Sequence, residues 1–309
     1  MTVFCKRGLA VWIFAIMTLF VNCSVNSWAK YKVADALSSN DNQAFVTDDD
    51  PELVGEAIPF TIKSYESLLA EMPDHTGLLT TVGKLYGNYA YGWIQLPADT
   101  LPDSQYKRQT AMMKRAKKFY LRGREYILRA LEINHPGFRS LLDEGDVDSA
   151  IALTEKGDTT LLYLGALCWS GAFLSDKFDL SMAATMDIPV AMMNRVLELN
   201  QQYGDGAVHE FFINYYGSLP ESKGGGEKKA REHFEKAVFL SDSAKASPYV
   251  SLALAVSVKT QNVEQFKELL NKAIAVDTDK NPHYRLANVL TQRKARWYLN
   301  NIGEFFLID

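Results

Sequence analysis

The sequence is poor in the residue types on which several common protein classes depend. Its 309 residues include only three cysteines, ten prolines and 19 glycines. Three cysteines cannot form a disulfide framework, and so few prolines and glycines favour helices over a β-sandwich with many turns. Basic charge is not in excess either, because 33 Lys and Arg residues face 37 Asp and Glu residues, for a formal net charge of −4. A nucleic-acid binder normally needs a basic surface to neutralise phosphates, so we expect no nucleic-acid partner.

Known motifs for metals, cofactors and catalysis are missing as well. The five histidines are scattered, and His209 is not followed by the second histidine of a zinc-binding helix. The glycines at 224–226 lack the Lys-Ser or Lys-Thr of a Walker loop, which favours a loop or capping role over an anion site. The aspartates at 48–50 lack the alternating ligands of a calcium loop, and Asp50 before Pro51 instead predicts a helix N-cap. We therefore expect no metal site, no cofactor and no catalytic residues.

The first residues have the order of a secretory signal peptide. Lys6 and Arg7 precede an uninterrupted run of 13 apolar or near-apolar residues, from position 9 to position 21. A bilayer span needs about 20 apolar residues, so this run indicates a signal rather than a membrane anchor. We therefore expect residues 1–22 to be a signal peptide of the lipoprotein type.

Cys23 is the expected site of lipid attachment. It follows the apolar run directly, and the segment 23–50 has the polar composition of a tether. Phe20 and Asn22 depart from the residues that usually precede a lipidated cysteine. Cleavage by ordinary signal peptidase after Ala29 is therefore the alternative, because the residues before that point satisfy its small-x-small rule.

A recurring helical pattern follows. Large, large, small and then aromatic or apolar residues stand at offsets 0, 3, 4 and 7, which places them on one stripe of an α-helix. The pattern occurs at Leu79, Val82, Gly83 and Tyr86, at Leu161, Leu164, Gly165 and Cys168, and at Tyr249, Leu252, Ala253 and Val256. A second pattern, with offsets 0, 4 and 7, occurs at Gly123, Ile127 and Ala130, at Ala230, Phe234 and Ala237, and at Phe266, Leu270 and Ala273. The two patterns are typical of the two helices of a tetratricopeptide hairpin, in which small residues let neighbouring helices approach closely.

The spacing of the patterns departs from the standard repeat of about 34 residues. Tyr86 and Gly123 are 37 positions apart, where the motif allows about nine. The excess contains a helix stop at 96–102, and a second long insertion surrounds Asp176. Such insertions can cover the concave surface of a solenoid. We therefore predict an all-α fold, a divergent tetratricopeptide-like α-solenoid of antiparallel helical hairpins with long inter-helix insertions, forming a single domain over residues 51–309.

A covered solenoid would enclose a cavity, and aromatic side chains at helical spacing are candidates for its lining. They are Tyr86, Tyr89 and Trp93 in the first hairpin, and Trp169 and Phe173 in the second. On the opposite stripe of the first helix, the candidates for meeting a carboxylate at the mouth are Lys84, Asn88 and Gln95. Together these residues define the predicted tunnel, which would hold a hydrophobic or organic-anion ligand. Aromatic stripes usually fill interiors, so core packing is the alternative.

One long helix, expected from about residue 106 to residue 134, is the most strongly charged element. The residues that advance along one of its faces are Lys107, Lys114, Lys118, Arg122 and Arg129, and we call them the basic stripe. A solvated helix face is the default interpretation of such a run. A surface for an acidic partner or for anionic lipid headgroups is the alternative.

Several segments are specific enough to compare with known families. They are DDDPELV at 48–54, SLLAE at 67–71 with PDH at 73–75, RAKK at 115–118 with YLRGR at 120–124, HPGF at 135–138, GGG at 224–226, PYVSLA at 248–253, LLNKA at 269–273, and RLAN at 285–288 with QRKARW at 292–297. In this order they resemble the T-component lipoproteins of TRAP transporters, the TatT family. The resemblance covers nearly the whole chain after the expected signal peptide.

The resemblance implies a role in solute uptake. Members of the family have a lipidated cysteine, matched here by Cys23, and divergent tetratricopeptide-like hairpins, and they have no established catalytic residues. They accompany TRAP systems, in which a periplasmic binding subunit captures a small organic anion for an ion-driven permease. The implied protein is a periplasmic accessory binding component, lipid-anchored to a membrane, whose partner is the TRAP solute-binding subunit. The solute, the inner or outer membrane, and a homo-oligomer such as a trimer are left open.

Two functions from other classes are the alternatives. A general tetratricopeptide-like scaffold of the cell envelope would use its repeats only to hold protein partners. An unrecognised hydrolase is less well supported, since the sequence offers no nucleophile and base pair. TRAP genes beside this gene would favour the transport role over both.

Overall fold

The structure, a computed structural model, describes residues 30–38 and 43–307. Within these ranges all regular structure is helical and no β-strand occurs, which confirms the predicted all-α class. The expected signal peptide at 1–22, Cys23 and the alternative cleavage site after Ala29 lie outside the described residues. None of the helices in the two ranges combines the length and the apolar character that a membrane span needs.

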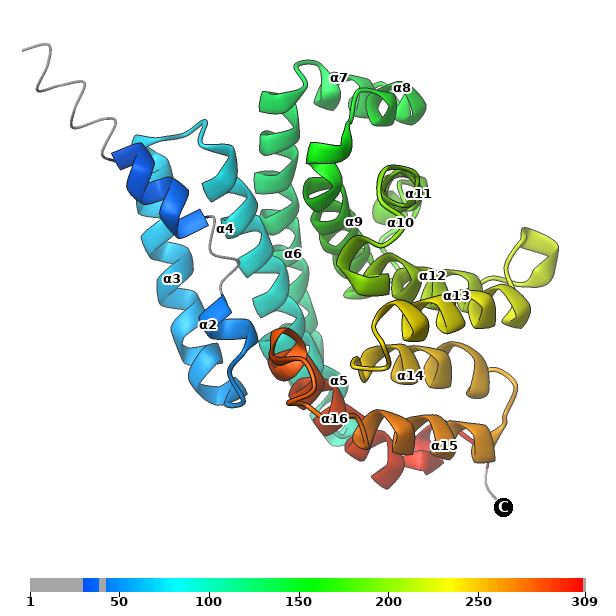
Figure 1. The fold of residues 1–309 in the computed structure, drawn as a ribbon. Helices are drawn as coiled ribbons and strands as arrows, with labels where there is room; N and C mark the ends of the chain where they lie inside the picture. The colour runs from blue at the N-terminus through cyan, green and yellow to red at the C-terminus, as the bar shows by residue number, and fades with distance from the viewer. Residues whose placement is uncertain (1–29, 39–42, 308–309) are drawn as a thin grey trace, which may run out of the picture.

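The N-terminal half of the described chain consists mainly of long helices (Figure 1). After a helix at residues 30–38, the elements are α2 (Gln43–Val46), α3 (Pro51–Glu71), α4 (Thr76–Tyr89), η1 (Ala90–Gln95), α5 (Leu96–Asp99), η2 (Asp103–Gln105) and α6 (Tyr106–Asn134). Helix α6 has the bounds predicted for the long charged helix. Helices α3, α4 and α6 lie side by side.

The C-terminal half consists of shorter helices. They are α7 (Phe138–Asp143), α8 (Val147–Ala152), η3 (Lys156–Asp158), α9 (Thr159–Leu174), α10 (Leu180–Ala183), α11 (Asp187–Leu199), η4 (Tyr203–Gly206), α12 (Ala207–Ser218), η5 (Glu221–Lys223), α13 (Glu227–Leu240), α14 (Ser247–Leu252), η6 (Ala253–Ser257), α15 (Val263–Ile274), η7 (Pro282–Tyr284), α16 (Arg285–Asn300) and η8 (Ile302–Glu304). Helix α9 packs on α6, and α12, α13, α14 and α15 are stacked on one another (Figure 1).

Side-chain caps fix where α3 and α4 begin. The carboxylate of Asp50 accepts a hydrogen bond from the backbone N–H of Leu53 at 3.0 Å, and Pro51 occupies the first helical position. The predicted N-cap is therefore confirmed. At the start of α4, Nδ1 of His75 accepts from the N–H of Leu78 at 3.1 Å. These caps satisfy N–H groups that have no partner inside the helix.

A helix stop is expected at 96–102. The helix ends at Asp99, the last residue of α5, and not at Pro97, the first proline of that segment. The helix passes Pro97 because the preceding segment η1 is a π-helix, in which the N–H of Leu96 bonds to the carbonyl of Tyr91. Proline is tolerated in the first turn of a helix, where its missing N–H would have no partner. The helix ends at Asp99, and η2 separates it from α6.

Glycines let α4 and α9 approach α6 closely. A Cβ atom added to Gly83 would lie 2.6 Å from the Ile127 side chain, and one added to Gly165 would lie 3.3 Å from it. Further towards the C-terminus of α9, a Cβ atom added to Gly171 would lie 2.5 Å from the Tyr120 ring. Residue numbers rise along α9 as they fall along α6, so the two helices are antiparallel. The packing agrees with the role expected for the small residues at Gly83 and Gly165, while the tetratricopeptide-like solenoid stays a prediction.

Helices α12 and α14 pack side by side in the same direction. Ser247 Oγ donates to Glu210 Oε2 at 2.8 Å, and Asn214 Nδ2 donates to Ser251 Oγ at 3.2 Å. Both pairs are separated by 37 residues. A constant separation between parallel helices is what a stacked repeat produces.

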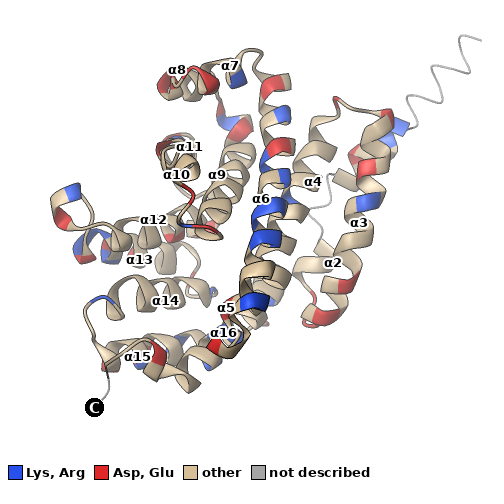
Figure 2. Ribbon diagram, turned by 180° about the vertical axis from the view of Figure 1, so that it is seen from behind, with Lys and Arg blue, Asp and Glu red and all other residues tan. Residues whose placement is uncertain are grey.

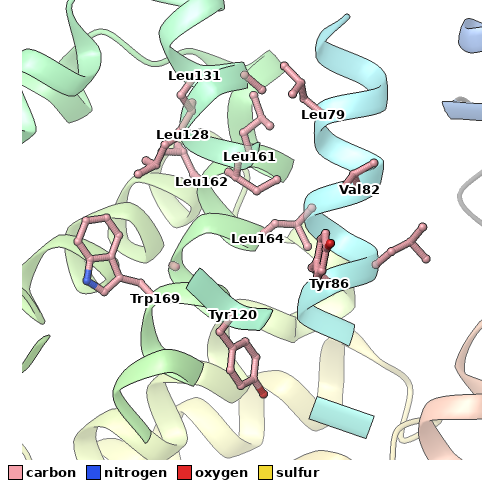
Figure 3. Packing of buried hydrophobic residues seen from close by; sticks show 14 of the residues in the cluster. Leu79, Val82, Tyr86, Tyr120, Leu128, Leu131, Leu161, Leu162, Leu164 and Trp169 are labelled. Carbon is pink, nitrogen blue, oxygen red and sulfur yellow. The ribbon is translucent and has the colours of Figure 1, made fainter. Parts of the chain in front are cut away.

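Buried apolar residues form two clusters. The larger includes residues of α3, α4, α6 and α9, and Figure 3 shows side chains from α4, α6 and α9 meeting in it. The smaller joins α12 to α16. Helix α16 also returns to the N-terminal helices (Figure 1). Arg293 forms an ion pair with Glu52 of α3, and Lys294 Nζ lies 3.6 Å from Asp99 Oδ2 of α5. These two contacts hold α16 against α3 and α5.

Part of the predicted tether 23–50 is helical. In the helix at residues 30–38, Ala34 is fully buried and the ring of Tyr31 stacks on His75 with centroids 5.6 Å apart. Asp35 Oδ1 lies 3.2 Å from His75 Nε2. This helix therefore packs on the start of α4, and the boundary between tether and fold stays a prediction.

Candidate functional site

Tyr86, the first aromatic residue of the predicted tunnel, is buried and packs against the rings of Phe119 and Tyr126. It is 1% exposed, its ring stacks on Tyr126 at 6.0 Å, and it meets the edge of Phe119 at 5.4 Å. The hydroxyls of Tyr86 and Tyr126 both donate to Glu66 Oε1, at 2.7 and 2.9 Å. Burial alone would raise the pKa of Glu66, but hydrogen bonds from Lys63 and the two tyrosines outweigh it and hold that pKa below its usual value. The carboxylate is therefore a charged centre of this network.

Tyr89 and Trp93 form a second stacked pair, between η1 and α3. Their ring centroids are 6.0 Å apart with an interplanar angle of 14°. Trp93 Nε1 donates to the carbonyl of Pro51 at 2.7 Å. A Cβ atom added to Gly55 would lie 2.2 Å from the same indole nitrogen. Trp93 thus fills the space that Gly55 leaves open on α3.

Trp169 and Phe173 lie apart from the first three aromatics. Trp169 is 7% exposed, and its Nε1 donates to Thr185 Oγ1 at 2.9 Å. Figure 3 shows the indole pointing away from the side of α9 on which Tyr86 lies. Phe173 is half-buried against the larger apolar cluster. No ring contact joins Trp169 to the other tunnel residues in the described part of the chain, so one tunnel bordered by all five aromatics stays a prediction.

Of the polar tunnel residues, Gln95 has a hydrogen-bond partner on another helix. Gln95 Oε1 accepts a hydrogen bond from the hydroxyl of Tyr120 at 2.6 Å, which ties η1 to α6. Asn88 is exposed, and Lys84 is half-buried. Gln95 is therefore occupied by a protein group in this structure.

The basic stripe is an accessible surface along α6 (Figure 2). Lys107, Lys114, Lys118 and Arg122 are exposed, whereas Arg129 is half-buried and donates to the carbonyl of Pro73 at 2.8 Å. The guanidinium of Arg122 also lies over the Tyr86 ring at 5.9 Å. Four of the five residues can thus meet a partner without a rearrangement of the helix.

Neighbouring Lys117 has a different role from the basic stripe. Its Nζ lies 2.8 Å from Asp176 and 2.6 Å from Asp179, in the connection between α9 and α10. The insertion predicted around Asp176 is therefore held against α6.

Sequence reasoning missed a half-buried charged pair between α5 and α16. Lys294 Nζ lies over the rings of Tyr298 and Tyr91, at 5.6 and 5.8 Å, in addition to its contact with Asp99. Burial raises the pKa of Asp99 in spite of the attraction of Lys294. No local sequence signal indicates this contact, because the two residues lie on helices far apart in the chain.

Arg124 is a second group that sequence reasoning missed. It follows Gly123 on α6, and its guanidinium carbon lies 4.3 Å from the centroid of the Trp169 ring. Its Nε is buried and has no hydrogen-bond partner within residues 30–38 and 43–307. Burial lowers the pKa of Arg124, because it disfavours the charged form.

A pair of histidines joins α12 to α13. The Nδ1 atoms of His209 and His233 are 2.9 Å apart, a hydrogen bond that needs at least one neutral ring. Burial lowers both pKa values, that of His233 to about 4. In the described ranges, no group of three or more His, Cys, Asp or Glu residues is arranged to hold a metal ion.

Cys168 is free and buried, as its apolar surroundings in the sequence indicate, and burial raises its pKa to about 12.

A known family and a sequence relative match most of this chain. The family described as TRAP transporter T-component matches residues 47–306, which include every helix from α3 to η8. A protein of Treponema pallidum (strain Nichols), described as an uncharacterized protein, is 33% identical over 270 residues. That alignment covers 86% of this chain and 83% of the relative. Both matches include the basic stripe and the residues of the predicted tunnel.

Proposed function

Because the chain belongs to the TRAP transporter T-component family, we propose that it is an accessory binding component of a TRAP-type solute uptake system. The family resemblance found in the sequence is confirmed. The observation that carries the proposal is the family match over residues 47–306. The family is one of transport components, and the proposal includes no catalytic step.

The proposed partner is the solute-binding subunit of the same TRAP system, and the proposed contact surface is the basic stripe. Lys114 and Lys118 are exposed and form no ion pair with another described residue, so their charges are available to an acidic surface. A row of like charges steers association with a surface of the opposite sign.

Family membership favours an extracytoplasmic location, and we propose a periplasmic protein held at a membrane by lipid on Cys23. The expected signal peptide at 1–22 and the cysteine immediately after it support this part of the proposal. Two acyl chains are enough for stable membrane attachment.

A ligand held in the predicted tunnel is the third part of the proposal. Its support is the set of aromatic side chains on α4, η1 and α9, which belong to the larger apolar cluster or pack against it. The scaffold alternative is favoured by one observation, namely that Tyr86, Trp93 and Gln95 all make hydrogen bonds to protein groups.

Co-purification tests the proposed function. The tagged full-length protein is isolated from its own cells, and the proteins and small molecules that accompany it are identified by mass spectrometry. Enrichment of a TRAP solute-binding subunit supports the proposal. Enrichment of unrelated envelope proteins without that subunit and without a small molecule would support the scaffold instead.

A further inference from the structure

Arg124 carries a guanidinium that has no acidic partner among the described residues. Among the buried side-chain nitrogen and oxygen atoms of the described residues, only Arg124 Nε and Ser170 Oγ lack a hydrogen-bond partner. Nη1 of Arg124 reaches only the sulfur of Met182, a weak acceptor, at 3.9 Å. Buried polar atoms are nearly always paired in folded proteins. An unpaired charged group therefore indicates that a partner is missing.

The carboxylate of the next residue in the chain does not fill this role. Glu125, the next residue, directs its two carboxylate oxygens to Arg139, at 2.6 and 2.8 Å. Trp169 and Met182, which contact the guanidinium, are both 7% exposed. A cation among buried apolar groups without a counter-charge destabilises the fold. An anion bound at Arg124 would remove that destabilisation.

Trp169 holds the guanidinium in place. The indole lies against the guanidinium with the carbon Cζ 4.3 Å from the ring centroid, and its own N–H is fixed by Thr185 at 2.9 Å. The ring contacts the guanidinium through its carbon, and the N–H groups of a guanidinium can form two parallel hydrogen bonds with a carboxylate. The Arg124 side chain is half-buried, so part of it is accessible from solvent.

The surroundings of Arg124 also specify the ligand. A single positive charge matches a single negative charge, because a dianion would leave one charge without compensation in an apolar site. The Trp169 ring and the Met182 thioether offer contact to an apolar ligand body rather than to hydroxyl groups.

We propose that Arg124 and Trp169 form a binding site for the carboxylate group of a small monovalent anion with an apolar body. The proposal rests on the proposed function, since it names the class of ligand that the transport component binds. It gives the carboxylate a different partner from Lys84, Asn88 and Gln95, the polar residues of the predicted tunnel.

Titration calorimetry with sodium hexanoate at constant ionic strength tests the site in the full-length protein. The wild-type protein is expected to bind hexanoate saturably and not to bind hexanamide, which has the same apolar body without the charge. Arg124→Gln should weaken hexanoate binding about tenfold or more, because the charge-assisted hydrogen bonds are lost. Bound hexanoate should also raise the melting temperature of the wild type but not that of the variant.

Arg115→Gln is the matched control. Arg115 is on the same helix and also lies over an aromatic ring, that of Phe119, but it is exposed and outside the basic stripe, so its removal should leave hexanoate affinity unchanged. Circular dichroism checks that Arg124→Gln is folded. If it is not, Arg124→Lys replaces it and should show a smaller loss of affinity, because lysine keeps the charge without the planar fork.

Three results would overturn the proposal: no saturable hexanoate binding by the wild type, equal affinity in wild type and the folded Arg124 variant, or equal binding of hexanamide. Each is distinct from failure of the proposed function. Complex formation with the solute-binding subunit is measured without hexanoate, so a protein that forms the complex and ignores hexanoate contradicts the Arg124 site alone.

Discussion

Gly83 and Gly123 face each other where α4 crosses α6. A Cβ atom added to Gly123 would lie 2.9 Å from the carbonyl oxygen of Gly83, and one added to Gly83 would lie 3.0 Å from the carbonyl oxygen of Gly123. The contact is between two backbones, so neither side can move away as a flexible side chain does. Both positions therefore need a residue without a Cβ.

Gly123→Ala is expected to lower the free energy of unfolding by about 2 kcal/mol, because overpacking costs more than the gain in helix propensity. Urea unfolding followed by circular dichroism measures the change. Gly303→Ala is the control, since nothing lies within 4 Å of a Cβ added there, and its stability should stay within about 0.5 kcal/mol of wild type. Equal stability of the two variants would show that α4 and α6 can separate without loss.

The sequence predicts a close helix approach at such small residues, though not which helices meet, because helix packing leaves a local, periodic trace. Gly83 stands in the pattern with offsets 0, 3, 4 and 7, and Gly123 opens the pattern with offsets 0, 4 and 7. The bounds of α6 and the N-cap at Asp50 could be predicted for the same reason, since both depend on neighbouring residues.

Contacts between distant helices leave no such trace. Lys294 and Asp99 meet only because α16 returns to α5, and Arg124 meets Trp169 only through the packing of α6 on α9. The helix also continues past Pro97, through the π-helical segment that precedes it. The proline alone does not indicate that segment, so the sequence does not predict the continuation. The contact between Arg124 and Trp169 could therefore be recognised only in the structure.

Charge reversal on the basic stripe tests the partner surface. Lys114→Glu combined with Lys118→Glu should weaken the complex with the solute-binding subunit about tenfold and flatten its dependence on salt. The melting temperature should not change, because both side chains are exposed and make no ion pair in the described part of the chain. Surface plasmon resonance at several salt concentrations measures both effects.

The matched control reverses two exposed lysines outside the basic stripe, with Lys223→Glu and Lys228→Glu near the start of α13. The net charge changes by the same amount, so only the position of the charge differs. If both double variants bind as the wild type does, the basic stripe is a solvated helix face.

Cys23→Ala should release the protein from membranes into the soluble periplasmic fraction. The reason is that each buried CH₂ of an acyl chain contributes about 0.8 kcal/mol to membrane binding. Cell fractionation measures the release, and Cys168→Ala, at the buried cysteine of α9, should leave the protein at the membrane. An unmodified mature N-terminus at Lys30 in the wild type would instead establish cleavage after Ala29.

The His209–His233 pair predicts a loss of stability in mild acid. Both pKa values are lowered below 6.5 in the folded protein, that of His233 to about 4. Protonation therefore favours the unfolded chain, whose histidines keep their usual pKa. The stabilisation is complete above pH 6.5 and is lost as the pH falls from about 6.5 towards 4. Nearby Lys229 and Lys236 act in the same direction, since they disfavour a charged His233.

Urea unfolding at pH 7.5 and pH 5.0 tests this dependence. Across that interval the wild type should lose about 1–2 kcal/mol more than His233→Gln, which cannot be protonated and leaves His209 as a single buried imidazole. His283→Gln serves as the control, because His283 is exposed, and it should lose as much as the wild type. The comparison between variants removes the contribution of carboxylates, which titrate in all three proteins. Equal losses in wild type and His233→Gln would mean that the pair accepts a proton without separating α12 from α13.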